Sequence, residues 1–154
     1  MIPKKFFVTG GKAISQVSEL NAFDLALKGA GIAQCNLVSV TSILPPKCKE
    51  TKQKEIPIGS ITHTVIAKMT GNGKTKKIAA GIAWAWEKNR KYGIVAEAHG
   101  RMDKGALKEK LEWRIREMAK IRGIEIGETK YRTEVLTVPK GNYGCAIAAL
   151  VYNL

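Results

Sequence analysis

Two adjacent hydroxyl side chains, Thr41 and Ser42, stand near the end of the stretch VSVTSILPP, residues 38–46. The stretch has the composition of a β-strand, but Pro45 and Pro46 cannot donate ladder hydrogen bonds, and Pro45 restricts the residue before it. We therefore expect the strand to stop near Ser42. Such a junction can hold one peptide bond in a strained conformation, and strain of this kind is often functional. The alternative is an ordinary strand end with both hydroxyls in a turn.

Other motifs that could bind a ligand or catalyse a reaction do not have the residue spacing that those functions require. The segment GNGKT, residues 71–75, ends like a phosphate-binding P-loop, but Lys68 stands where that motif requires its first glycine. An Asn-Gly hairpin turn explains the segment better. His63 and His99 lack metal-ligand spacing, and no GxSxG nucleophile elbow is present. The three cysteines stand far apart without CxxC spacing, so we expect reduced thiols and no metal site.

The composition predicts one globular domain, residues 1–154, with a strongly basic surface. Of its 154 residues, 45% are hydrophobic and 25% are charged, and the formal net charge is +13. The charge could reflect nucleic-acid binding or a solvated surface, but the basic residues are scattered without interleaved aromatics or a known binding motif. The apolar runs are too short to cross a bilayer, and no secretory signal is recognised. The sequence therefore predicts a cytoplasmic protein without membrane contact.

The elements that must position these residues follow an α+β pattern. Strands are predicted over residues 4–9, 33–42, 60–69, 76–86, 92–98, 129–138 and 144–153, and the third and fourth of them read as a β-hairpin around an Asn-Gly turn. Alternation along 33–42 would place Asn36 and Ser42 on the same face. Alternation along the fourth strand puts large side chains on one face and small ones on the other, so both faces must be covered.

Two helices are predicted. The first covers about residues 21–28, with Asn21 as its N-cap and Leu20, Phe23 and Leu27 on one face. The second begins after Asp103, continues to about Arg122 and ends at Gly123. Its apolar stripe consists of Leu107, Leu111, Ile115 and Met118. Two sheet layers with helices outside them would cover every apolar face.

The stretch around the two hydroxyls resembles a known family. LNAFDLALKGAGIAQCNLVSVTSILPP, residues 20–46, is similar to the pyruvoyl-dependent arginine decarboxylases. In that family an LNAFD segment opens a helix, an AGI turn and an asparagine-containing strand follow, and a Ser-Ser or Thr-Ser pair precedes Ile-Met/Leu-Pro-Pro. The resemblance extends more weakly over nearly the whole chain, through VAEAHG, REMAK and GCAIAAL. The LNAFD and TSILPP blocks together are hard to obtain by chance.

The resemblance implies that the chain cuts itself between Thr41 and Ser42. In such enzymes the serine hydroxyl attacks the preceding carbonyl carbon, and elimination and hydrolysis then leave a pyruvoyl group on the new chain. Ser42 would become the pyruvoyl group, with a β chain of residues 1–41 and an α chain of residues 42–154. The pyruvoyl ketone would condense with the substrate's amino group and act as an electron sink while CO₂ leaves, without pyridoxal phosphate or a metal.

The resemblance also assigns roles to other residues. Asn36 matches an asparagine that supports self-cleavage or substrate placement, and Glu97 matches the proton donor. From the residues alone, Asn36 could be a strand amide bonded to nearby backbone, and Glu97 could form an ion pair. His99 stands where at least one member of the family has a second acid. Positions matched to substrate binding are Asp24, Leu27, Ala33, Cys35 and Ile43.

Asp24 matches the aspartate that faces the substrate guanidinium, which a carboxylate can bind through two hydrogen bonds. It could equally help to cap the first helix. The implied function is decarboxylation of arginine to agmatine and CO₂, a step in polyamine synthesis. The implied fold is an αββα sandwich of mainly antiparallel sheets, assembled as a homotrimer or a dimer of trimers. Alternatives are the same chemistry on another amino acid, an unprocessed non-catalytic homologue, or a basic nucleic-acid-binding domain.

Overall fold

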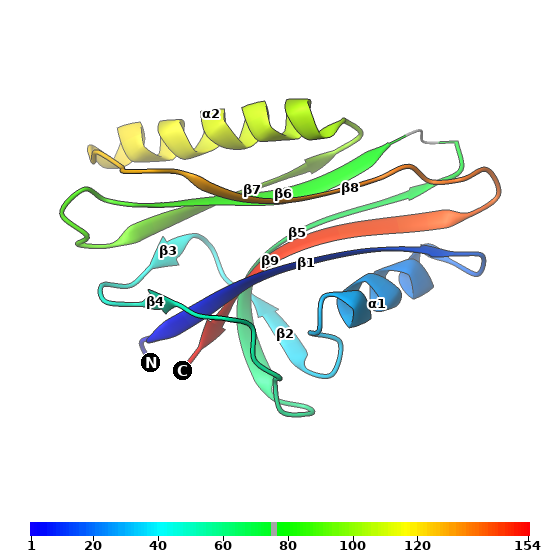
Figure 1. The fold of residues 1–154 in the computed structure, drawn as a ribbon, viewed down its shortest axis with the longest axis horizontal. Coiled ribbons are helices and arrows are strands. Elements are labelled where there is room, and N and C mark those ends of the chain that lie inside the picture. Colours follow the sequence, from blue (N-terminus) through cyan, green and yellow to red (C-terminus); the bar gives the residue numbers. More distant parts are fainter. Residues whose placement is uncertain (75–76) are drawn as a thin grey trace.

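Two β-sheets stack face to face between two helices, which confirms the predicted αββα sandwich (Figure 1). A computed structural model of the chain describes residues 1–74 and 77–154. Sheet A has the strand order β2-β5-β9-β1-β4, and sheet B has the order β3-β7-β6-β8. Sheet A consists of β1 (Lys5–Ser15), β2 (Asn36–Ser39), β4 (Lys49–Glu50), β5 (Ile61–Asn72) and β9 (Tyr143–Asn153). Sheet B consists of β3 (Ile43–Leu44), β6 (Ile78–Trp86), β7 (Gly93–Gly100) and β8 (Lys130–Leu136).

Helix α2 (Lys104–Arg122) covers the outer face of sheet B as the sequence predicts. The Asp103 carboxylate accepts a hydrogen bond from the Ala106 N–H at 2.9 Å and caps the helix. Gly123 ends it with a φ of 64°, a left-handed conformation that favours glycine. Among the described residues, no helix combines the length and the apolar character needed to cross a bilayer.

Helix α1 (Glu19–Gly29) covers the outer face of sheet A, but it differs from the prediction at its start and on its buried face. Ser18 caps it, because the Ser18 hydroxyl accepts a hydrogen bond from the N–H of Asn21, the residue predicted as the cap. Leu20 is 76% exposed, and the fully buried residues are instead Ala22 and Ala26. Small side chains allow the helix to approach sheet A closely.

The predicted hairpin is wrong. β5 lies in sheet A between β2 and β9, whereas β6 lies in sheet B between β7 and β8. The two strands therefore face each other across the core instead of sharing a ladder. Thr75 and Lys76, which belong to the predicted turn and strand start, lie outside the described residues. The predicted alternation of β6 is confirmed: its large side chains fill the core between the sheets, and its small ones lie beneath α2.

The single strand predicted over 33–42 is also wrong. β2 ends at Ser39 in sheet A, and β3 begins at Ile43 in sheet B. The chain therefore leaves one sheet and enters the other within three residues. Because the strand does not continue to Ser42, alternation cannot place Asn36 and Ser42 on one face.

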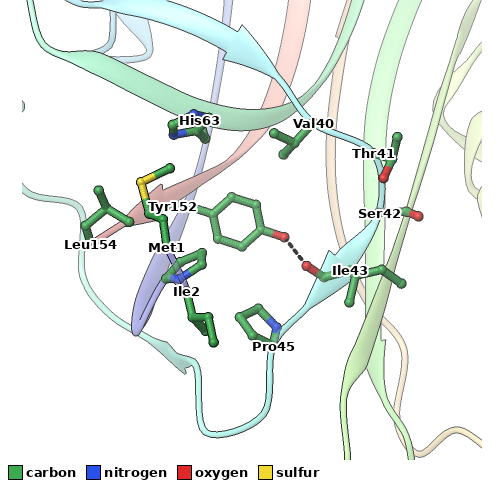
Figure 2. Close-up of a pocket in the computed structure, with 11 residues that line it drawn as sticks. Met1, Ile2, Val40, Thr41, Ser42, Ile43, Pro45, His63, Tyr152 and Leu154 are labelled. Atoms are coloured by element: carbon green, nitrogen blue, oxygen red, sulfur yellow. Dashed lines mark hydrogen bonds between the residues drawn. The ribbon is translucent and has the colours of Figure 1, made fainter.

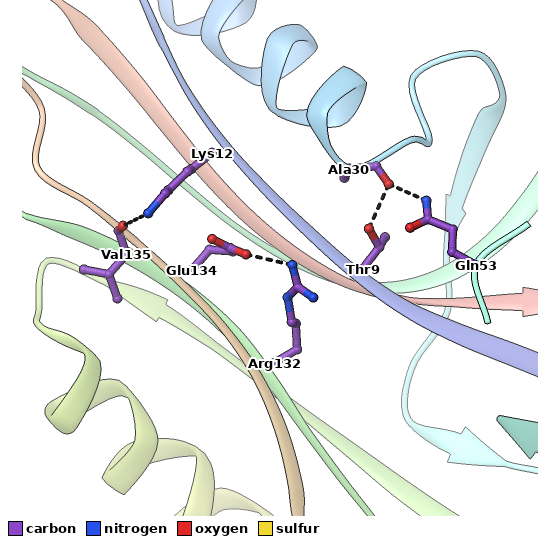
Figure 3. Close-up of polar contacts among 7 residues, drawn as sticks. All are labelled: Thr9, Lys12, Ala30, Gln53, Arg132, Glu134 and Val135. Atoms are coloured by element: carbon purple, nitrogen blue, oxygen red, sulfur yellow. Dashed lines mark hydrogen bonds and ion pairs between the residues drawn. The ribbon is translucent and has the colours of Figure 1, made fainter. Parts of the chain in front are cut away.

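Polar contacts fix the start of β2 and the spacing of the sheets (Figure 3). The Ala30 carbonyl at the end of α1 accepts hydrogen bonds from the Thr9 hydroxyl at 2.8 Å and the Gln53 amide at 2.7 Å. Between the sheets, the Lys12 ammonium on β1 donates to the Val135 carbonyl on β8 at 3.2 Å. The Arg132–Glu134 ion pair within β8 lies opposite Gly10 on β1, where an added Cβ would be 2.9 Å from both side chains. The turn that leads into β2 is thus tied to the strand layer beneath it.

Candidate active site

Thr41 and Ser42 lie in the link between the two sheets, and each side of the link is held by a different sheet. The Val40 N–H donates to the Thr64 carbonyl on β5 of sheet A at 2.9 Å. The Ser42 carbonyl accepts from the Val95 N–H on β7 of sheet B, also at 2.9 Å. The peptide bond between Thr41 and Ser42 is therefore the point at which the chain passes between the layers.

A cavity of about 310 Å³ opens beside this link (Figure 2). Its walls are mostly apolar and come from both chain ends, the link, β5 and β9. The residues are Met1, Ile2, Pro3, Val40, Thr41, Ser42, Ile43, Pro45, His63, Tyr152 and Leu154. Figure 2 shows the Tyr152 hydroxyl directed at the Ile43 carbonyl, while the Ser42 side chain points away from the tyrosine ring.

Glu97 lies on β7, two residues beyond Val95, so it shares a face with the residue that binds Ser42. Two residues along a strand span roughly 7 Å. Glu97 is exposed in the single chain, but partial desolvation of its carboxyl raises the pKa above its ordinary value, and charge on His99 and Arg114 offsets part of the rise. The Arg114 guanidinium donates to the Glu97 backbone carbonyl at 2.5 Å. Within residues 1–74 and 77–154, the ion pairs that the structure shows do not include the Glu97 carboxylate. Glu97 is thus disposed to keep its proton to higher pH than an ordinary glutamate.

Asn36 is exposed, and its side-chain amide donates to the Gly59 carbonyl at 3.0 Å. Its backbone N–H donates to the Ser60 carbonyl at 2.8 Å. In the single chain the side chain therefore anchors the loop before β5, as one of the two interpretations from the sequence expects. Asn36 does not line the cavity at Ser42.

The residues matched to substrate binding fall into two groups. Ile43 lines the cavity together with Thr41 and Ser42. The other four lie on α1 or in the turn that follows it, and none of them lines the cavity: Asp24, Leu27, Ala33 and Cys35. Asp24 and Ala33 are exposed, whereas Leu27 and Cys35 are partly buried against the core beneath α1.

Tyr152 and His63 line the cavity, although nothing in the sequence singles out the first and the second was considered only as a metal ligand. The Tyr152 hydroxyl donates to the Ile43 carbonyl at 2.6 Å. A tyrosine in a continuous apolar strand is a usable signal, because a buried phenol needs a polar partner. The sequence does not reveal which partner, since Ile43 is distant along the chain.

Comparison with known proteins identifies relatives along almost the whole chain. A family model described as pyruvoyl-dependent arginine decarboxylase matches residues 5–153. A pyruvoyl-dependent arginine decarboxylase of Methanopyrus kandleri is 32% identical over 98% of this chain and 97% of its own length. One from Methanococcus aeolicus is 34% identical over 96% of this chain and 88% of its own length. One from Thermococcus kodakarensis is 32% identical over 97% of this chain and 94% of its own length.

A solved structure of a pyruvoyl-dependent histidine decarboxylase at pH 8 matches with a TM-score of 0.53 and 16% identity. The match covers 68% of this chain and 56% of the histidine decarboxylase chain, so this chain spans just over half of that protein. At this identity the likeness concerns the fold alone.

Proposed function

This chain belongs to the pyruvoyl-dependent arginine decarboxylase family, and we propose that it makes its own cofactor by cutting the bond between Thr41 and Ser42. As a member of that family it is an enzyme that decarboxylates arginine, which gives agmatine and CO₂. Its family depends on a covalent pyruvoyl group. The proposed source of that group is Ser42, with residues 1–41 as the β chain and 42–154 as the α chain.

The passage of the chain between the sheets is the observation that carries this proposal. Val40 is bonded to β5 and the Ser42 carbonyl to β7, so the ends on either side of the bond are held independently. Cutting the bond between them disturbs no strand ladder, since β2 ends at Ser39 and β3 begins at Ile43. The junction can therefore be opened while both sheets stay intact.

The site also fits a pyruvoyl group in size and in bonding. The cavity of about 310 Å³ at Ser42 is larger than a three-carbon keto acid needs and lies at the low end of the range for ligand pockets. When present, the group supplies an electron sink for the decarboxylation. The Val95 N–H would hold the carbonyl of residue 42 in place, and the apolar walls would exclude water. Glu97 would return a proton to the carbon that lost CO₂.

We further propose that the active site is completed by a second copy of the chain in a homotrimer. Asp24 is the residue suited to a guanidinium, but in one chain it lies on the outer side of α1, away from the cavity. The edge formed by β2 and β5 exposes apolar side chains: Val38 is 41% and Ile61 is 70% exposed. Ile43, beside the link, is 37% exposed. A neighbouring copy that covers this edge would bury them and could bring its own Asp24 to the site.

Denaturing mass spectrometry of freshly purified protein tests the self-cleavage. We expect two chains divided after Thr41, the larger one beginning with a pyruvoyl group. The Ser42→Ala variant should remain a single chain of 154 residues, because it lacks the attacking hydroxyl. A single intact chain in folded, assembled wild-type protein would overturn the proposal and favour an unprocessed homologue.

A further inference from the structure

We propose that Tyr152 is a positioning residue for cleavage at Ser42, and that it acts with the backbone N–H of Val95 as a two-point clamp on the carbonyls of Ser42 and Ile43. The proposal rests on the self-cleavage proposed above. It assigns a role to a side chain that the resemblance to the family leaves without one.

The first point of the clamp is the Tyr152 hydroxyl, which donates to the Ile43 carbonyl at 2.6 Å. Tyr152 lies on β9 of sheet A and is 7% exposed, so its ring is fixed by packing. The Ile43 carbonyl belongs to β3, a strand of only two residues in sheet B. This bond therefore joins the two sheets directly behind the proposed cleavage site.

The second point is the Val95 N–H, which donates to the Ser42 carbonyl at 2.9 Å. The two bonds hold the first two carbonyls after the bond to be cut. They come from different sheets, since Val95 lies on β7 and Tyr152 on β9. Two anchors on successive residues restrict rotation of the Ser42 backbone more than either would alone.

Restricted rotation favours the first step, in which the Ser42 Oγ attacks the Thr41 carbonyl carbon. The new C–O bond forms, the peptide C–N bond breaks, and the hydroxyl proton ends on the Ser42 nitrogen, leaving an ester and a free amine. Such an attack needs the reacting atoms about 3–3.5 Å apart and aligned. A clamp on the Ser42 and Ile43 carbonyls limits how far the Ser42 Cα can move from that geometry.

The Val95 N–H has a second effect in the elimination that follows. A base removes the Ser42 Cα proton, the Cα–Cβ double bond forms, and the Cβ–Oγ bond breaks, so that Thr41 leaves as a carboxylate. Negative charge then develops on the Ser42 carbonyl oxygen, and the Val95 N–H already points at that oxygen. Tautomerisation of the remaining enamine to an imine and hydrolysis by water release ammonia and leave the ketone.

Tyr152 keeps its proton throughout the pH range in which the protein would work. Burial raises the pKa of the Tyr152 phenol to about 12, and the nearby Cys48 thiol adds to the rise. The phenol therefore remains a neutral hydrogen-bond donor to the Ile43 carbonyl.

The test compares Tyr152→Phe with wild type during cleavage of newly synthesised protein, sampled over time by denaturing mass spectrometry. We expect cleavage to slow about tenfold or more, since a looser link spends less time in the geometry that the attack needs. Tyr143→Phe is the matched control. It makes the same change on the same strand, and the Tyr143 hydroxyl has no hydrogen-bond partner among the described residues.

Replacing the Val95 N–H by an ester oxygen, with the α-hydroxy analogue of valine, tests the second point. We expect the ester formed at Ser42 to accumulate in this variant, because elimination loses its donor. Hydroxylamine cleaves both this ester and the one introduced before residue 95, so it should release a fragment of residues 42–94 that begins with Ser42 in place of a pyruvoyl group. In Tyr152→Phe, hydroxylamine should release much less chain that begins with Ser42, since the acyl shift itself is slow. A general loss of stability would not produce this difference.

Circular dichroism and thermal unfolding establish that each variant is folded. Cleavage of folded Tyr152→Phe within twofold of the wild-type rate would overturn the role of Tyr152. Should that variant fail to fold, wild-type behaviour of the Val95 ester variant with hydroxylamine would overturn the clamp. If the wild-type protein itself stays uncleaved, the proposed self-cleavage at Ser42 is wrong, and the role of Tyr152 is overturned with it.

Discussion

At the scale of single residues, Glu97 has the strand position and the raised pKa that suit the proton-donor role proposed for it. It follows Val95, whose N–H holds the Ser42 carbonyl, and burial raises its pKa. Arg114 donates a hydrogen bond to the backbone carbonyl of Glu97. The same strand, β7, thus holds the Ser42 carbonyl through Val95 and carries the proposed proton donor two residues further on.

The Glu97→Gln variant separates cofactor formation from turnover. We expect cleavage after Thr41 to proceed largely as in wild type, while the rate of CO₂ release falls about 10²- to 10⁴-fold, because the amide cannot donate the proton. Mass spectrometry measures the first quantity and CO₂ release per pyruvoyl group the second. Full CO₂ release in the variant would refute the role assigned to Glu97.

The pH dependence of turnover should report on the same carboxyl. Because only the protonated form donates, kcat should fall as pH rises through the Glu97 pKa, and the raised pKa puts this fall above pH 4.5. His99→Gln removes a positive charge that lowers this pKa, so the fall should move to higher pH. An unchanged pH profile in His99→Gln would show that a group other than Glu97 controls the fall of kcat at high pH.

The residues proposed to react, Thr41, Ser42 and Glu97, can be picked out from residue order, because they belong to short local motifs. The partners of these residues could not. Val95 binds Ser42 through its backbone N–H, and since nearly every residue has a backbone N–H, the residue type does not reveal such a donor. Tyr152 meets Ile43 only because β9 and β3 face each other in the folded sandwich.

At the scale of elements, the close approach of α1 to β1 sets the position of the turn that leads to β2. The buried helix residues are alanines, and Gly11 on β1 lies directly against the helix backbone. A Cβ on Gly11 would collide with the Ala26 carbonyl, a backbone atom that cannot move aside without shifting α1. The glycine is therefore required by space.

Gly11→Ala should accordingly destabilise the protein by about 1–3 kcal/mol, as overpacking of a tight interface does. Gly29→Ala is the matched control, because nothing lies within 4 Å of a Cβ there and the residue is helical. It should leave stability unchanged or raise it by up to about 1 kcal/mol. Denaturant unfolding of both variants measures the difference, and equal stabilities would refute the space requirement.

The elements that were predicted correctly are those whose signals are local. Helix α2 follows from Asp103, Gly123 and one apolar stripe, all within a single stretch. The hairpin prediction failed because an Asn-Gly turn signal does not determine which strand pairs with which. β5 pairs instead with β2 and β9, strands that are not its neighbours in the sequence, so its partners cannot be identified from local signals.

At the scale of the whole molecule, the proposed cut would leave two chains that remain interlocked. Residues 1–41 contain β1, α1 and β2, and β1 pairs with β9 along its whole length. β2 pairs with β5, and the buried Phe6 and Phe7 lie in two separate parts of the core. Most of what holds the small chain is therefore unaffected by the loss of one peptide bond.

Native mass spectrometry should show residues 1–41 and 42–154 together in one particle in equal amounts. They should separate only in denaturant, since removing β1 would expose the long edge of β9 and both cores. Free residues 1–41 in native buffer would contradict this picture. The Ser42→Ala protein, which stays in one piece, provides the comparison for particle size.

Both ends of the chain line the same cavity as Ser42, through Met1, Ile2, Pro3 and Leu154. An affinity tag fused to either end would therefore emerge at the mouth of that cavity and could crowd the substrate. We expect such a fusion protein to be cut normally and to turn over slowly. A removable tag is the sounder design for any of the measurements above.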